Sequence, residues 1–263
     1  MSYQNILFTL ENEVAVITFN RPESLNSFTT EMHAEVREVM KRIQRDPAIR
    51  CLVITGAGRG FCAGQDLNDR AVAPGESMPD LGESIEKNYN PLVRSIMQLE
   101  KPVICAVNGI AAGAGANIAL ACDIVLAARS AGFIQGFSKI GLIPDSGGTW
   151  MLPRMLGRAR AMGLVLLNNK LTAEQALQWG LIWQVFDDDA LMDETMKLAR
   201  QLAGQPTRGF GLSKRAINAS GGNSLDQQLA LEQELQSIAG RSHDYREGVA
   251  AFLEKRQPEF LGE

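Results

Sequence analysis

Two kinds of apolar pattern alternate through the first half of the chain. Short β-branched or fully apolar runs predict four buried strands, at Val14–Phe19, Cys51–Thr55, Pro102–Val107 and Asp123–Ala127. Apolar residues at helical spacing follow Phe28 and recur between Leu81 and Gln98. Strands that alternate with helices imply β-α crossovers, so we expect an α/β core with a mainly parallel sheet.

Helix signals dominate the rest of the chain. Strand patterns fade after about Ser146, and two capping-box sequences, Thr172–Gln175 and Ser224–Gln227, predict helix starts. Ser27 is the expected N-cap of the first helix. The polar segment Ala73–Asp80 reads as a surface loop. We therefore expect an α/β core over residues 1–200 and a helical C-terminal region over residues 201–263.

Charge and composition narrow the function classes. The 263 residues carry 26 basic and 30 acidic side chains, a net charge of −4. No basic surface is indicated for nucleic acid or for an anionic membrane. The longest uncharged run, Pro102–Cys122, is rich in glycine and interrupted by asparagine, which makes it a poor membrane span.

Histidine and cysteine usage disfavours a metal centre. His33 and His243 are the only histidines, and the four cysteines show no C-x-x-C spacing. Each cysteine lies in an apolar or Gly/Ala-rich stretch, which is typical of a buried thiol in a reducing compartment. The N-terminus shows no signal peptide. We expect a cytoplasmic protein without a metal.

Glycine-rich turns follow several of the predicted strands. A dinucleotide fingerprint needs a third glycine, but Phe61 follows Gly56-x-Gly58 and Ile118 follows Gly113-x-Gly115 at that position. No G-K-[ST] sequence occurs. Two interpretations stay open: tight turns at strand ends, or backbone amides that approach a substrate oxygen.

The segment Asp145–Gly148 contains the candidate chemistry. Asp-Ser-Gly-Gly is similar to the nucleophile segment of trypsin-like proteases, but Pro144 replaces the usual glycine, and His33 is expected on a helix face rather than beside Ser146. Asp145 ends an apolar run, where a carboxyl group can take part in proton transfer. The structural alternative is that Asp145 caps a helix beginning at Ser146.

Ordered motifs along almost the whole chain resemble the crotonase (enoyl-CoA hydratase/isomerase) family. They include Asn20–Ser27, Gly60–Leu67, Lys101–Asn117, Gly141–Gly148, Gly157–Ala159, Ala176–Leu181 and Arg246–Arg256. The resemblance implies a crotonase-like β-β-α spiral core followed by helices. It also implies homotrimers, commonly paired into homohexamers.

The family resemblance implies a coenzyme A thioester as the substrate and partner, with no separate cofactor. The backbone amides of Gln65 and Ala114 would hold the thioester oxygen, where enolate-like charge develops. The implied contacts to the coenzyme are Ser24, Leu25, Asn26, Ala63, Asp66 and Leu67, together with Phe252 and Lys255 at the C-terminus, often from a neighbouring subunit.

Departures from the hydratase pattern indicate an isomerase. Hydratases of the family use two glutamates to activate water, and this chain has Asn117 and Phe137 at those positions. Asp145 stands where isomerases and a dehalogenase branch carry an acid. The resemblance thus implies that Asp145 moves a proton from one carbon to another.

Local strings resemble a branch of the family that acts in aerobic phenylacetate degradation. They are Gly58–Arg70, Tyr89–Arg94 and Gly240–Gly248. The implied reaction converts ring-1,2-epoxyphenylacetyl-CoA to oxepin-CoA, and the implied second activity shifts a 3,4 double bond of an enoyl-CoA to the 2,3 position. Alternatives are a generic enoyl-CoA or dienoyl-CoA isomerase, and a non-catalytic CoA-ester-binding or RNA-binding member, the RNA role being disfavoured by the negative charge.

Overall fold

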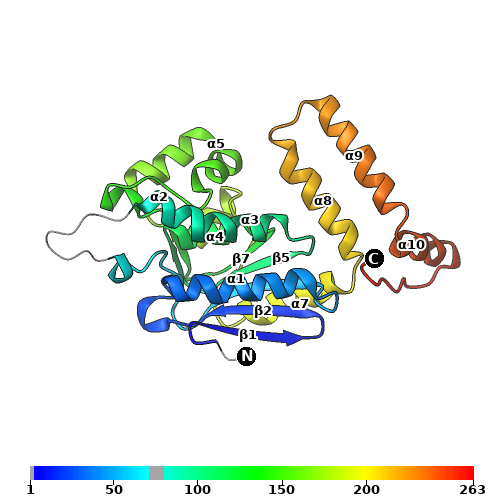
Figure 1. The fold of residues 1–263 in the computed structure, drawn as a ribbon, viewed down its shortest axis with the longest axis horizontal. Coiled ribbons are helices and arrows are strands. Elements are labelled where there is room, and N and C mark those ends of the chain that lie inside the picture. The colour runs from blue at the N-terminus through cyan, green and yellow to red at the C-terminus, as the bar shows by residue number, and fades with distance from the viewer. Residues whose placement is uncertain (1–2, 71–79) are drawn as a thin grey trace.

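Two sheets form the core of the computed structural model, which describes residues 3–70 and 80–263 (Figure 1). Within those residues the larger sheet has the strand order β1 (Ile6–Glu11), β2 (Val14–Phe19), β3 (Cys51–Gly56), β5 (Val103–Val107), β7 (Ile124–Ala128) and β10 (Gln184–Phe186). Only β1 runs antiparallel to its neighbour. The mainly parallel α/β core predicted from the sequence is confirmed. The two edge strands, β1 and β10, were not predicted from the sequence.

The smaller sheet carries the segments that matter for the site. Its order is β4 (Gly60–Cys62), β6 (Ile110–Ala112), β8 (Gly132–Ile134) and β9 (Leu171–Thr172). Each of the first three strands follows a strand of the larger sheet after a short connection. The repeated pair of strands followed by a helix is the β-β-α arrangement expected for this fold.

Helices cover the sheets with their apolar faces, and these faces follow the spacing predicted from the sequence. Helix α1 (Thr30–Arg45) buries Met32, Val36 and Ile43, and α7 (Leu191–Ala203) packs against β3 and β5. The predicted helix at 81–98 is α2 (Leu81–Ser84), the π-helical turn η3 (Ile85–Tyr89) and α3 (Asn90–Gln98) in succession. Residues 73–79 of the predicted surface loop lie outside the described residues.

The predicted helix caps are only partly correct. Both capping boxes are present, at the start of α6 (Ala173–Gln178) and of α9 (Leu225–Ala239). Ser27, however, is not the N-cap of α1; Thr29 is, and its hydroxyl accepts the Met32 amide. The Ser27 hydroxyl instead donates to Asp66, so a tertiary contact takes the side chain that local sequence assigned to the helix.

The C-terminal helices extend away from the core. Figure 1 shows α8 (Thr207–Ser220) and α9 as a hairpin beside the sheets, with α10 (His243–Glu254) beyond them. Arg50, which precedes β3, donates to the Gln205 and Phe260 carbonyls and so ties the start of α8 and the C-terminal tail to the core. No helix in the described part of the chain is long and apolar enough to cross a membrane.

Candidate active site

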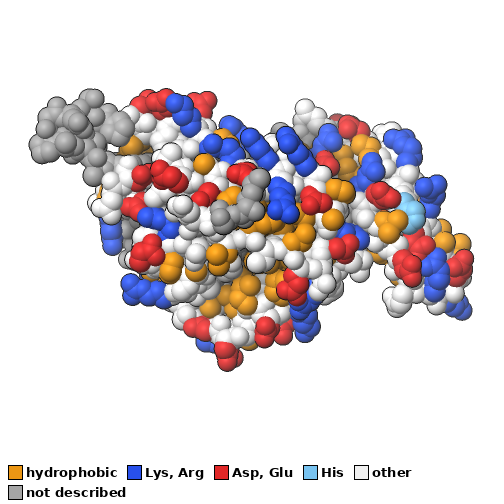
Figure 2. All heavy atoms as spheres, turned by 60° about the horizontal axis from the view of Figure 1, so that its bottom comes forward, with side chains coloured by type: hydrophobic (Ala, Val, Ile, Leu, Met, Phe, Trp, Pro, Cys, Tyr) orange, Lys and Arg blue, Asp and Glu red, His pale blue; other side chains and the backbone are white. Residues whose placement is uncertain are grey.

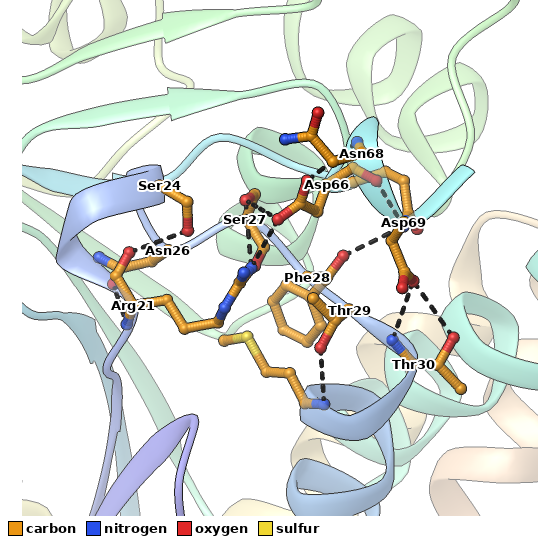
Figure 3. Close-up of polar contacts among 12 residues, drawn as sticks. Arg21, Ser24, Asn26, Ser27, Phe28, Thr29, Thr30, Asp66, Asn68 and Asp69 are labelled. Carbon is orange, nitrogen blue, oxygen red and sulfur yellow. Dashed lines mark hydrogen bonds and ion pairs between the residues drawn. The ribbon is translucent and has the colours of Figure 1, made fainter. Parts of the chain in front are cut away.

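The first part of the site is a polar cluster between the β2–α1 loop and the segment after β4 (Figure 3). An Arg21 guanidinium nitrogen lies 2.9 Å from an Asp66 carboxylate oxygen, and the Ser27 hydroxyl and the Asn68 amide also donate to Asp66. Partial burial favours a higher pKa for Asp66, but the hydrogen bonds from Arg21 and Asn68 outweigh it, and the pKa is lowered. Asp66 is thus an ionised anchor between two loops.

Asn26 stabilises the same loop from inside. It is fully buried, accepts a hydrogen bond from the Arg21 amide, and donates to the Ala57 and Gly60 carbonyls. Leu25 and Asn26 both have left-handed backbone conformations, at φ 51° and 58°. The Asn26 side chain therefore holds the loop in shape, and the exposed surface nearby comes from other predicted contact residues, such as Leu67.

Gly64 brings two distant segments of the chain together. Its φ is +87°, and a Cβ atom there would lie 3.0 Å from the Ala112 oxygen and 3.2 Å from the Ala114 nitrogen. Only glycine combines this conformation with so close an approach. On the other side of the junction, a Cβ at Gly115 would lie 2.3 Å from the Cys62 oxygen. The peptide groups of residues 62–65 and 112–115 are therefore packed directly against each other.

The amides of Gln65 and Ala114 are both free at this junction. Phe28 forms a parallel bridge with Gln65, using the Gly64 carbonyl and the Asp66 amide, so the Gln65 amide projects to the opposite side. Ala114 is the first residue of α4 (Ala114–Leu120), where an amide has no partner within the helix. Within residues 3–70 and 80–263, no hydrogen bond from either amide is present. Two free amides can bind a carbonyl oxygen that gains negative charge.

Asp145 lies on a strained turn before α5 (Gly148–Leu167). Ser146 and Gly147 have φ values of +51° and +81°, and the Ser146 hydroxyl donates to the Asp145 carboxylate at 2.9 Å. The predicted N-cap role of Asp145 is wrong, because Gly147 occupies the N-cap without a side-chain bond. The Gly148 amide bonds to the Asp145 carbonyl instead, which leaves the carboxylate for other partners.

Helix α4 connects the Asp145 turn to the Ala114 amide. One turn after Ala114, the fully buried Asn117 donates to the Asp145 carbonyl at 2.8 Å and accepts from Gln135 at 3.2 Å. A carbonyl can only accept a hydrogen bond, so this contact fixes the orientation of the Asn117 amide. The Asn117 side chain thus supports the turn that carries Asp145 by bonding to the backbone of that turn.

Neither of the positions at which the family resemblance implies the hydratase glutamates carries a carboxylate. Asn117 is engaged as described, and Phe137 is buried with its ring 3.8 Å from where a Cβ of Gly113 would lie. An apolar ring therefore borders the segment that leads into the Ala114 amide. This surface favours an apolar group over a bound water molecule.

Two of the predicted coenzyme contacts lie far from the rest. Figure 1 places α10, which carries Phe252, at the opposite end of the molecule from α2. Phe252 is 83% exposed, and Lys255 is the left-handed C-cap of the helix. One chain therefore gathers Ser24, Leu25, Asn26, Ala63, Asp66 and Leu67 near the free amides but does not bring Phe252 and Lys255 to them.

The structure adds Arg21, Gln135 and Tyr89 to the site residues considered from the sequence. Arg21 pairs with Asp66, Gln135 holds Asn117, and the Tyr89 hydroxyl donates to the Gln65 side chain at 3.0 Å. Their contacts span long sequence separations, so no local pattern could have indicated them. The helical spacing around Tyr89 indicates only that it lies on the buried, apolar face of a helix.

Comparisons with known proteins find relatives along almost the whole chain. The family model for enoyl-CoA hydratase/isomerase matches residues 9–263. The chain is 64% identical to the 1,2-epoxyphenylacetyl-CoA isomerase of Escherichia coli, with 98% of each chain covered, and 46% identical to a probable enoyl-CoA hydratase of Rhodobacter capsulatus, with full coverage of both. A crystal structure of enoyl-CoA hydratase from Bacillus anthracis superposes with a TM-score of 0.93 at 32% identity, covering 99% of this chain and 100% of that one. The chain belongs to the enoyl-CoA hydratase/isomerase family, the crotonase family.

Proposed function

We propose that the protein is a CoA-thioester isomerase that converts ring-1,2-epoxyphenylacetyl-CoA to oxepin-CoA in aerobic phenylacetate catabolism. The 64% identity to the isomerase from Escherichia coli supports this substrate. Relatives of this chain carry both isomerase and hydratase names, so the site has to separate the two chemistries. The observation that carries the proposal is a single candidate acid, Asp145, with an amide and a phenyl ring at the hydratase glutamate positions.

The Gln65 and Ala114 amides bind the thioester oxygen in this mechanism. Removing a proton from the carbon next to the thioester carbonyl shifts negative charge onto that oxygen. Two amides that are already oriented stabilise this charge without reorganisation, and losing one such donor costs about 100- to 1000-fold in rate. Neither amide has an acceptor among the residues that the structure describes, which supports the assignment.

Asp145 acts as the acid/base. Its carboxylate takes the proton from the carbon beside the carbonyl and returns a proton to a ring carbon, while the carbon–carbon bond shared by the epoxide and the six-membered ring breaks. Atoms and electrons balance without an oxidant or a reductant, so the enzyme needs no cofactor beyond the CoA of its substrate. The same proton relocation would shift a 3,4 double bond of an enoyl-CoA to the 2,3 position.

Coenzyme binding and assembly complete the proposal. The loop of Ser24–Asn26 and the segment Ala63–Leu67 would contact the adenine and pantetheine, with Phe252 and Lys255 supplied by a neighbouring subunit of a homotrimer or homohexamer. Hydrophobic side chains that remain exposed on the C-terminal helices support an assembly; on the right of Figure 2 such side chains lie among charged ones. Four buried free cysteines fit a reducing cytoplasm.

Replacing one carboxyl oxygen tests the proposal. Asp145→Asn keeps the size of the side chain but removes the base, so we expect kcat for the aromatic epoxide CoA ester to fall by about 100- to 10,000-fold. Product analysis by liquid chromatography measures it. Asp187→Asn, at an exposed acid that pairs with Arg129, is the matched control and should keep the wild-type kcat. A folded Asp145→Asn variant that binds the CoA ester and turns over at the wild-type rate would rule out the mechanism.

A further inference from the structure

The Gln65 side chain is held at all of its polar atoms, although only its backbone amide is assigned to the substrate. Its Nε2 donates to the Phe28 carbonyl at 3.1 Å and to the Asp66 carbonyl at 3.2 Å. Both partners can only accept, so the amide group has one orientation, with Oε1 on the opposite side. Oε1 receives a hydrogen bond from the Tyr89 hydroxyl at 3.0 Å.

Tyr89 is itself held rigidly. It is fully buried, and its ring packs edge-on against His33 of α1 at 4.4 Å between centroids and also against Phe28. A ring fixed on two sides cannot follow a moving partner. The hydroxyl position is therefore set by the core rather than by Gln65.

The backbone around Tyr89 departs from a regular α-helix. Tyr89 ends the π-helical turn η3, and Pro91, which has no amide hydrogen, follows in the first turn of α3. The Lys87 carbonyl instead accepts a hydrogen bond from Arg37 of α1, which also donates to Asn88. π-Helical turns inside helices are frequent at functional sites. Here the turn sets the helical position from which Tyr89 reaches Gln65.

We propose that Tyr89 is a positioning residue of the oxyanion-binding site, acting through the Gln65 side chain to fix the Gln65 amide. The proposal rests on the proposed function of that amide. The parallel bridge to Phe28 holds the peptide groups on either side of Gln65, and the Tyr89 hydroxyl restrains rotation of the residue between them. Rate depends on such placement because a misplaced donor stabilises the developing charge less.

The test removes one oxygen atom. Tyr89→Phe retains the ring and its packing, so we expect a folded enzyme whose kcat falls about 10-fold with KM changed less than about twofold, part of the loss expected for a whole donor. Gln65→Met removes the acceptor from the other side. If one hydrogen bond is responsible, the double variant is no slower than the slower single variant.

A spectroscopic measurement separates positioning from general damage. With phenylacetyl-CoA labelled with ¹³C at the thioester carbonyl, difference infrared spectra of the bound ester report polarisation of the carbonyl. The band should lie at lower frequency in the wild type than in Tyr89→Phe. Ser95→Ala, which removes a hydroxyl bonded within α3, is the matched control and should keep both kcat and the band.

Each result has one meaning. Wild-type kcat and an unshifted carbonyl band in Tyr89→Phe would overturn the proposal, and so would equal losses in Tyr89→Phe and Ser95→Ala. If Tyr89→Phe is unaffected while Asp145→Asn is inactive, the positioning role alone fails. If Asp145→Asn is fully active, the proposed function fails first.

Discussion

At the scale of single residues, the contacts of Asp66 explain why a buried carboxylate is tolerated beside the loop of Ser24–Asn26. Arg21 compensates its charge, and the Ser27 hydroxyl and the Asn68 amide complete its hydrogen bonds. Breaking such a pair on one side leaves an uncompensated buried charge, which costs more than the pair itself contributes. The loop should therefore depend on both partners together.

The lowered pKa of Asp66 predicts how its contribution changes with pH. A carboxyl whose folded pKa lies below its ordinary value of about 3.9 stabilises the fold above that pH, and the contribution is lost as pH falls through the folded value. We expect Asp66→Asn to lower the free energy of unfolding by roughly 1–3 kcal/mol at pH 7, and by progressively less as the pH falls below the ordinary value of about 3.9. Urea unfolding at several pH values measures this. A deficit that is the same at all pH values would contradict the ion-pair explanation.

Residue roles could be predicted from the sequence only where local geometry decides them. Thr172 and Ser224 cap helices as expected because both partners of a capping box lie within four residues. Ser27 and Asp145 were also candidate caps by residue type, but the contact of Ser27 with Asp66 and the strained turn at Ser146 place the caps elsewhere. The identity of Asp145 as a candidate acid was accessible from the family resemblance, whereas its support by Asn117 required the fold.

At the scale of elements, α5 is two helical segments joined at Gly157. This residue has φ 74° and ψ 163°, a conformation that is essentially restricted to glycine. The break redirects the second half of the helix after Leu156, a core residue. The apolar pattern of α5 does not indicate the break, because a glycine within a helical pattern is also compatible with a continuous helix.

Substitution at the break should separate conformation from space. Apart from the adjoining residues of the helix, no atom in the part of the chain that the structure describes lies within 4 Å of a Cβ at Gly157. Gly157→Ala therefore introduces strain without a collision, and we expect the free energy of unfolding to fall by roughly 1–3 kcal/mol. Gly163, also in α5, likewise has open space around it but lacks a positive φ. Gly163→Ala should raise stability by about 0.5–1 kcal/mol. Thermal unfolding of both variants decides; equal effects would mean that the break does not constrain the helix.

At the scale of the whole molecule, the buried strands of the larger sheet, β2, β3, β5 and β7, were the most predictable part of the fold. Runs such as Cys51–Thr55 and Val103–Val107 are buried along their whole length, and this makes their sequence pattern unambiguous. The placement of α8–α10 beside the core was not predictable, since it depends on tertiary hydrogen bonds such as those of Arg50. The sequence pattern therefore predicts the buried core better than it predicts the placement of α8–α10.

The exposed apolar end of α10 predicts an effect on assembly. Phe252 and Leu253 are 83% and 74% exposed in the single chain, so a charge there should disrupt burial against another subunit. If the proposed homotrimer or homohexamer forms through α10, Phe252→Asp should reduce the solution mass from three or six times 28.6 kDa towards that of one chain, and raise KM for the CoA ester. Light scattering after size exclusion gives the mass. Leu7→Asp on β1 is the control, and dissociation by Leu7→Asp alone would place the interface elsewhere.

The junction between the two free amides also has a chemical consequence through Cys62. Burial raises the pKa of its thiol to about 12, so only roughly one molecule in 100,000 is a thiolate at pH 7. The Cys62 sulfur accepts a hydrogen bond from the Gly64 amide and has no exposed surface. Oxidants and alkylating reagents can therefore reach the Cys62 thiol only when the segment around it opens. We therefore expect the rate at which this junction opens, rather than the intrinsic reactivity of the thiol, to set the rate of Cys62 modification.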